Sequence, residues 1–143
     1  MVVLDTNILV AALWSIRGSS FRIVQEALRG NLQIAVSVAL ALEYEDVLKR
    51  AAMREASWAS DGELDMVLDA LLNVARRIQP IRLQGRPLLA DPNDDMVLEC
   101  ALQANAGAIV TMNVRDFASA KRRFGIDVLK PGDFLARFMG FEG

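Results

Sequence analysis

Short, wholly apolar segments recur along this chain, and longer segments in which apolar residues return every three or four positions lie between them. The short segments predict strands buried on both faces, as in the centre of a parallel sheet, and the longer ones predict helices with one face on a core. The predicted strands are residues 1–4, 32–36, 108–111 and 127–129, with residues 78–83 as a further candidate. The predicted helices are residues 7–14, 20–28, 40–50, 61–78, 92–105, 117–124 and 131–139.

Strands that alternate with helices in this way are typical of an α/β fold. We therefore expect a three-layer α/β/α arrangement around a central, mostly parallel sheet of four to five strands. The 143 residues contain no repeat, low-complexity tract or linker, so a single domain over residues 1–143 is expected.

Composition narrows the chemistry that this domain could perform. The chain has no histidine, which excludes histidine acid–base catalysis, Ser-His and Cys-His pairs, and His-ligated zinc. Cys100 is the single cysteine and lies in an apolar run, where a small buried hydrophobe is expected rather than a nucleophile. The net charge of −2 gives no overall attraction to nucleic acid. The chain has no secretory leader and its first apolar run is only strand-length, so we expect a cytoplasmic protein without a membrane segment.

The remaining candidates for chemistry are carboxylates near strand and helix ends. Asp5 follows the first predicted strand, at the kind of edge where α/β proteins bind ligands, but Asp5, Thr6 or Asn7 could equally cap the next helix. Glu43 lies on the third predicted helix, where its side chain could project over the preceding strand end or face solvent.

The densest acidic segment is Asp91-Pro92-Asn93-Asp94-Asp95. A helix start explains Asp91 as the cap and Asp94 in the first turn, where the helix dipole favours negative charge. It explains Asp95 less well, because a further adjacent carboxylate repels the others unless a cation screens them. We therefore interpret Asp95 as a candidate metal ligand.

A last polar segment follows the predicted strand at residues 108–111. Thr111 and Asn113 could bind a ligand or a water, and Asp116 could cap a helix or complete an acidic cluster. Carboxylates with Asn and Thr, and without His or Cys, form an oxygen-only ligand set suited to Mg²⁺ or Mn²⁺. Such an ion can lower the pKa of a bound water that attacks phosphorus, which favours phosphodiester hydrolysis.

At these residues the sequence resembles the PIN domain family of metal-dependent nucleases, over essentially the whole chain. The resemblance is carried by the order and spacing of several short motifs: residues 3–7 (Val-Leu-Asp-Thr-Asn), Ser37 with Glu43, residues 91–101, residues 109–117, and residues 129–135. It implies that Asp5, Glu43 and Asp95 hold the metal, with Asp116 or the position of Asn113 as fourth member. Thr6, Asn7 and Thr111 would support the site.

Two points in this assignment stay open. Many relatives carry aspartate where this chain has Asn113, so the fourth carboxylate is Asp116 or is missing, and either one or two metals are compatible with the pattern. Asp94 competes with Asp95 for one ligand position.

The most similar subgroup contains toxin components of bacterial toxin–antitoxin modules, which cleave RNA and are held inactive by an antitoxin. The resemblance thus implies an RNA substrate and an antitoxin partner. Basic residues that could contact the RNA backbone are Arg17, Arg22, Arg115, Lys121, Arg122 and Arg123. Trp14, Met53 and Trp58 lie in or beside irregular segments, where they either contact an antitoxin or a second copy of the chain, or pack on the domain itself.

Two other functions compete with a ribonuclease toxin. A haloacid-dehalogenase-like phosphatase would use Asp5 as nucleophile, but Asn7 stands where that chemistry needs a second aspartate. A catalytically inactive PIN-like domain would bind RNA or a partner without cutting, and Asn113 is the feature that favours it.

Overall fold

The computed structural model describes residues 1–50, 55, 57–79, 89 and 91–138. Its strands are all parallel and form two ladders. The first ladder joins β1 (Val2–Leu4), β4 (Ala108–Val110) and β5 (Asp127–Leu129) in the order β1-β4-β5. The second joins β2 (Ala35–Ser37) to β3 (Arg76–Ile78).

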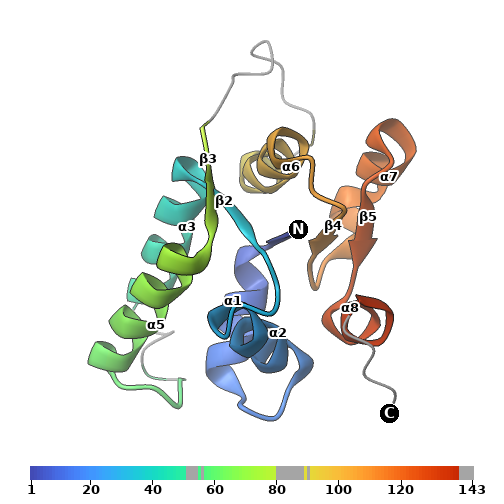
Figure 1. Ribbon diagram of the computed structural model, residues 1–143. Coiled ribbons are helices and arrows are strands. Elements are labelled where there is room, and N and C mark those ends of the chain that lie inside the picture. Colours follow the sequence, from blue (N-terminus) through green and yellow to red (C-terminus); the bar gives the residue numbers. More distant parts are fainter. Residues whose placement is uncertain (51–54, 56, 80–88, 90, 139–143) are drawn as a thin grey trace.

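A single parallel bridge between Val2 and Ile34 connects the two ladders, and the Val2 amide donates to the Gln33 carbonyl at 3.0 Å. The strands therefore run β3, β2, β1, β4, β5 across the molecule (Figure 1). All residues of β1, β2 and β4 are buried, as their apolar sequences predict. The expected parallel sheet is confirmed.

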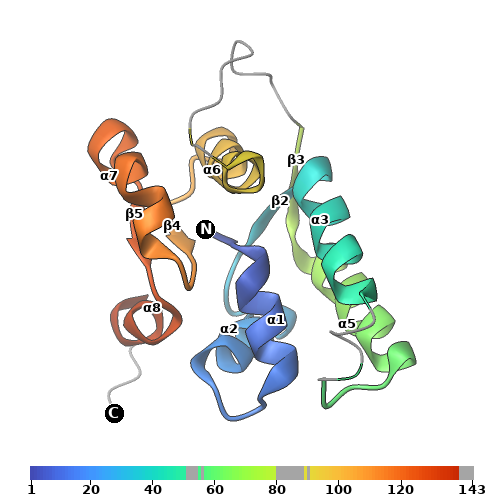
Figure 2. The same ribbon diagram turned by 180° about the vertical axis from the view of Figure 1, so that it is seen from behind.

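Helices cover this sheet on opposite sides. Figures 1 and 2 show α6 on one side and α1 with α2 on the other, which gives the expected layered α/β arrangement. The helices are α1 (Thr6–Trp14), α2 (Ser19–Leu28), α3 (Val38–Lys49), α5 (Asp61–Val74), α6 (Pro92–Ala104), the 3₁₀ helix η1 (Val114–Phe117), α7 (Ala118–Phe124) and α8 (Pro131–Phe138). Within the described ranges, no helix combines the length and the apolar character that a membrane crossing requires.

The long helix predicted over residues 61–78 is wrong at its C-terminal end. Helix α5 starts with a capping box between Ser60 and Glu63 but ends at Val74, and Arg76–Ile78 forms β3 instead. The Arg76 amide donates to the Ile34 carbonyl at 2.8 Å, so the open edge of β2 supplies backbone partners for this segment. Sheet pairing here overrides the helical spacing of the apolar residues. Of the further candidate strand at residues 78–83, residues 80–83 lie outside the described residues.

Cys100 is buried on α6 with 1% of its surface exposed. Burial raises the pKa of its thiol to about 11, and hydrogen bonds from Ser37 oppose the shift only in part. A thiol with that pKa carries almost no thiolate at neutral pH, so Cys100 has no nucleophilic character. The structure agrees with the expectation of a small buried hydrophobe.

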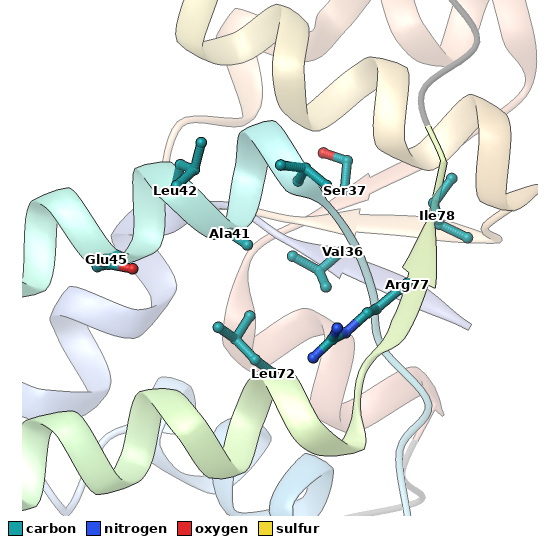
Figure 3. A pocket seen from close by; sticks show the side chains of 9 residues that line it. Val36, Ser37, Ala41, Leu42, Glu45, Leu72, Arg77 and Ile78 are labelled. Atoms are coloured by element: carbon teal, nitrogen blue, oxygen red, sulfur yellow. The ribbon is translucent and has the colours of Figure 1, made fainter.

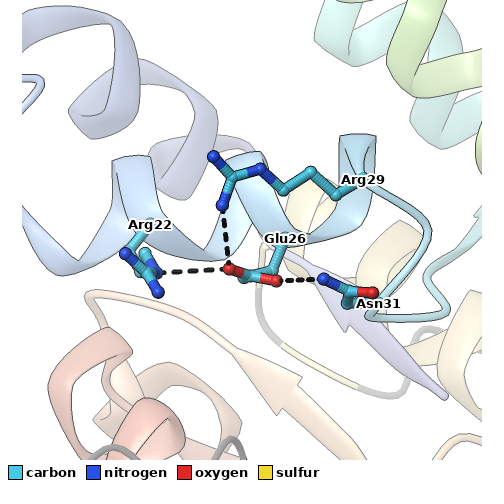
Figure 4. A network of polar contacts seen from close by, with 4 residues as sticks. All are labelled: Arg22, Glu26, Arg29 and Asn31. Carbon is cyan, nitrogen blue, oxygen red and sulfur yellow. Dashed lines mark hydrogen bonds and ion pairs between the residues drawn. The ribbon is translucent and has the colours of Figure 1, made fainter.

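The end of α2 is held by a buried carboxylate, Glu26, which is 4% exposed (Figure 4). Its Oε2 atom accepts from Asn31 Nδ2 at 2.7 Å, and Oε1 lies 3.3 Å from Arg22 Nε and 3.5 Å from Arg29 Nη1. The chain turns between these residues at Gly30, whose φ of 80° is one that side chains disfavour. Glu26 thus ties the last turns of α2 to the segment that leads into β2.

We expect Glu26→Gln to lower the free energy of unfolding by about 1–2 kcal/mol, because it weakens three contacts of a buried, charge-assisted acceptor whose arginine partners are partly exposed. Urea unfolding would measure this. The matched control is Glu45→Gln, which removes an exposed pair with Lys49 on α3 and should cost less than about 0.5 kcal/mol. Equal losses in the two variants would contradict the stabilising role of Glu26.

Candidate metal centre

The centre of the site is Asp5, which follows β1 and is 9% exposed. Asp5 caps α1, as one sequence interpretation predicts, and it also faces other polar groups; its role as a metal ligand stays a prediction. Its Oδ1 atom accepts from the Thr6 amide at 2.8 Å, which satisfies one free N–H at the start of that helix. Its Oδ2 atom is left for contacts across the sheet.

Strand pairing brings the neighbouring strand end to this second oxygen. The Asp5 amide donates to the Val110 carbonyl at 2.9 Å, which places the next residue of that chain segment, Thr111, beside the carboxylate. Thr111 is fully buried, and its hydroxyl donates to Asp5 Oδ2 at 2.7 Å. Asn7 Nδ2 also donates to Asp5 Oδ2, at 3.2 Å. The three residues predicted to support Asp5, namely Thr6, Asn7 and Thr111, all contact it.

A tyrosine that the sequence analysis did not single out anchors α3 to this strand end. Tyr44 is 1% exposed, and its hydroxyl donates to the carbonyl of Leu4, the last residue of β1. Burial, then the charges of Cys100 and Asp5, raise its pKa well above the ordinary value, so it stays a neutral donor. A lone tyrosine among apolar helix positions needs a partner for its hydroxyl, which is a usable sequence signal.

Electrostatics connect Asp5 with two further carboxylates. Burial raises the pKa of Asp5, and the charge of Asp116 adds to the rise, while the hydrogen bonds from Thr111, Thr6 and Asn7 oppose it. The pKa of Asp94 is raised to about 6, first by burial and then by Asp5, Asp91, Asp116 and Asp95. Asp5, Asp94 and Asp116 therefore lie close enough to repel one another.

The adjacent residues Asp94 and Asp95 have different surroundings. Asp95 is 9% exposed, and its Oδ1 atom accepts from the Leu89 amide at 2.5 Å. Asp91 caps α6 by accepting from the Asn93 amide at 2.9 Å. Burial raises the pKa of Asp94, and the charges of Asp5 and Asp116 add to the rise. Because the Asp95 carboxylate is hydrogen-bonded to the Leu89 amide, these charges favour Asp94 as the carboxylate that faces Asp5.

Glu43 is half-buried on α3, and within the described residues no hydrogen bond or ion pair joins it to Asp5. Asn113 precedes η1, where its amide donates to the Thr111 hydroxyl at 3.0 Å, and its side chain caps nothing. In the described part of the chain, no three Asp, Glu or Cys side chains are arranged as ready ligands for one metal ion. The carboxylates are thus close but not positioned around a common point.

A family model of the PIN domain matches residues 1–115, which is most of the chain. The chain belongs to the PIN domain family. PIN domains are generally nucleases and typically use divalent metals. No curated protein matches the sequence.

Among solved structures, this PIN domain is similar in fold to a chain of VapBC2 from Rickettsia felis, solved bound to a DNA fragment from their promoter. The TM-score is 0.59 at 22% sequence identity, and the match covers 91% of this chain and 98% of that one. The fold is therefore shared over most of both chains.

Five of the six basic residues predicted for RNA binding divide into two groups in this PIN domain; the sixth, Arg123, is exposed and its guanidinium lies 5.1 Å from the centroid of the Phe124 ring. Arg22 pairs with Glu26, and Lys121 lies 2.6 Å from the Asp127 carboxylate, whose pKa its hydrogen bond lowers. Arg17, Arg115 and Arg122 are exposed, and no ion pair joins them to another described residue. Of these three, Arg115 lies in η1 next to Asp116, whereas Arg17 follows the end of α1 opposite to the end that Asp5 caps.

An apolar cavity of about 240 Å³ lies elsewhere in the PIN domain, between α3, α5 and the ladder of β2 and β3 (Figure 3). Its lining includes Val36, Leu42, Leu72 and Arg77. None of the clustered aspartates lines this cavity, so it is separate from the candidate metal centre.

We expect Asp94→Asn to stabilise the metal-free protein at neutral pH. A folded-state pKa of about 6, above the ordinary value of 3.8, means that this group favours folding below about pH 4 and loses that contribution as pH rises through 6. Asparagine removes the repulsion, which outweighs the favourable position of Asp94 in the first turn of α6. Urea unfolding in EDTA should show a higher free energy of unfolding for Asp94→Asn than for the parent chain at pH 7.5, and little difference at pH 4.

The control for this measurement is Asp69→Asn, on the exposed face of α5. Asp69→Asn should not raise the free energy of unfolding at pH 7.5 relative to pH 4 in this way. Destabilisation by Asp94→Asn at pH 7.5 would show that the clustered carboxylates do not repel one another in the folded protein.

Proposed function

We propose that this PIN domain is a Mg²⁺- or Mn²⁺-dependent endoribonuclease that hydrolyses RNA phosphodiester bonds, as the toxin of a type II toxin–antitoxin module. The observation that supports it most is the position of Asp5 at the end of β1, beside the end of the parallel strand β4, with Asp94 at the start of α6 and Asp116 in η1 near enough for their charges to act on one another. Ligands bind at such edges in α/β proteins.

The donor set fits a divalent cation. The clustered groups are all oxygen donors. Burial is the main cause of the raised pKa values of Asp5 and Asp94, and the charges of neighbouring aspartates add a repulsion that a cation would relieve. We assign Asp5, Asp94 and Asp116 as ligands, with Glu43 as the fourth carboxylate and Asp95 as the neighbour that fixes the start of α6. When bound, the ion would supply a water of lowered pKa and screen the phosphate charge.

The chain's own residues orient this site. Thr111 and Asn7 hold Oδ2 of Asp5 in place, so its carboxylate direction is set before substrate arrives. Arg115 is exposed beside Asp116 and can contact a phosphate oxygen of the RNA backbone. Arg17 and Arg122 are exposed and available for more distant phosphates. Arg22 and Lys121 contribute less, because acidic neighbours already pair with them.

Incubation of the purified protein with mixed structured RNAs and Mg²⁺, Mn²⁺ or EDTA tests the nuclease. Asp5→Asn should lower cleavage by at least about 100-fold, because even residues that only support metal ligands cost up to roughly that factor. Asp94→Asn should lower it similarly. The adjacent Asp95→Asn is the matched control and should retain more activity than Asp94→Asn; the reverse order would make Asp95 the ligand.

A second candidate function is a PIN domain that binds RNA without cutting it. Two observations favour it: Asn113 occupies a position where many relatives have aspartate, and the described carboxylates are not preformed as a ligand set. In the same experiment, RNA binding without cleavage under any cation would support this function and reject the nuclease.

The partner of this toxin would be a cognate antitoxin. Trp14 and Ile16, at the end of α1, expose 56% and 57% of their surfaces, which supports an apolar protein contact there. Trp58 packs on the domain itself: its Nε1 atom donates to the Ala12 carbonyl at 3.0 Å and its ring meets Phe21 edge-on at 5.9 Å. Met53 lies outside the described residues. A second copy of the chain is the alternative occupant of the same surface.

The toxin assignment predicts that induced expression of the chain in a bacterial host slows growth. Asp5→Asn should relieve the slowing at equal protein level, because only catalysis is removed. Trp14→Glu should slow growth as the parent chain does in a host without the antitoxin, since the end of α1 is remote from the acidic cluster. Unchanged growth with a soluble, RNA-cleaving chain would show a nuclease that is not a toxin.

A further inference from the structure

The segment after β4 forms a tight turn around the Thr111 hydroxyl. That hydroxyl donates to Asp5 Oδ2 and accepts from the Asn113 amide at 3.0 Å. The residue between them, Met112, donates its own amide to Asn7 Oδ1 at 3.2 Å. The backbone of Met112 is therefore held by the same residues that hold Asp5.

The side chain of Met112 is only partly covered by the rest of the domain. It is 43% exposed, although Thr111 before it is fully buried and Phe117 after it lies in the core. Only two hydrogen bonds, through Asn7, separate its amide from the Asp5 carboxylate. A large, apolar and accessible side chain thus stands at the rim of a site whose other described groups are aspartates, Asn113 and Arg115.

Most of these neighbours suit the charged part of a nucleic acid, and Asn113 can hydrogen-bond the edge of a base but offers no apolar surface for its face. Carboxylates hold cations and Arg115 holds phosphate oxygens, and both are common to every nucleotide. An unstacked base, by contrast, offers a flat aromatic face that needs an apolar partner. The polarisable thioether of methionine makes favourable contacts with aromatic rings and adapts to their shape.

We propose that Met112 is a positioning and specificity residue that packs against the nucleobase next to the scissile phosphate. The proposal rests on the proposed ribonuclease function and adds to it a contact with a base. The turn fixes the backbone of Met112, so packing a base against this side chain places the adjoining phosphate at Asp5. Purines, which have the larger face, gain more from this contact than pyrimidines.

This contact is tested by comparing the parent chain with Met112→Ala on two substrates. One substrate is a short single-stranded RNA, and the other is the same RNA with an abasic nucleotide next to the cleaved bond. On the intact RNA, Met112→Ala should lower kcat/KM by about 5- to 20-fold, mostly through KM, in line with the lower range of stacking contributions. On the abasic RNA, Met112→Ala and the parent chain should cleave equally well.

Three controls separate base contact from other effects. Met112→Leu keeps an apolar side chain and should retain most of the activity. Met66→Ala replaces a methionine that is 70% exposed on α5 and should leave kcat/KM on both RNAs unchanged. The rise in thermal midpoint on adding Mn²⁺ should be the same in Met112→Ala as in the parent chain, since the ligands are unaltered.

Equal losses on the intact and abasic RNA, or no loss on either, would overturn the role of Met112 and leave the nuclease standing. Absence of cleavage by the parent chain under every cation would overturn the nuclease and the base contact together. The two failures therefore give different results.

Discussion

The parallel pairing of β1 with β4 is the constraint on which the site depends. Val3 lies opposite Ile109 in this ladder, and both residues are fully buried. Because the strands run in the same direction, Asp5 and Thr111, 106 residues apart, leave the sheet side by side and form a hydrogen bond. The core that buries these strands is therefore also what sets the direction of the Asp5 carboxylate.

The site surrounds a buried acid with hydrogen-bond donors. Burial and the charge of Asp116 raise the pKa of Asp5, while Thr111, Thr6 and Asn7 lower it. Among the described residues no such set of donors opposes the rise at Asp94, whose pKa reaches about 6. The folded chain thus holds carboxylates closer together than their charges favour, which costs stability in the absence of a cation. Such opposition between stability and site geometry is expected where a site is selected for binding.

Much of this arrangement could be predicted from the sequence, for identifiable reasons. The strands β1 and β4 are wholly apolar because both faces are buried, and the polar residues that follow them mark the ligand edge. The donors around Asp5 could be predicted because they are sequence neighbours or follow the paired strand. The contact of Tyr44 with Leu4 could not be predicted in the same way, because it depends on how α3 packs across the end of β1.

Two further details depended on tertiary structure. Arg76–Ile78 continues the helical pattern of α5 but pairs with β2, since a sheet edge offered it backbone partners. Asp94 and Asp95 are adjacent in sequence, and their surroundings distinguish them: Asp95 accepts from the Leu89 amide, whereas burial and the charges of Asp5 and Asp116 raise the pKa of Asp94. Spacing identified the acidic segment, whereas the direction of each side chain depended on what the start of α6 packs against.

The turn from β4 into η1 combines structural and functional residues within a few positions. Thr111 is buried and hydrogen-bonded to Asp5, and Phe117 is buried in the core. The exposed residues between them are Met112, Asn113, Arg115 and Asp116. Buried residues at both ends fix the turn, so the exposed side chains in the middle can change without loss of the fold. A turn held at both ends in this way fixes where its exposed side chains lie and leaves their identity free to vary, as is common where loops on a rigid scaffold carry binding residues.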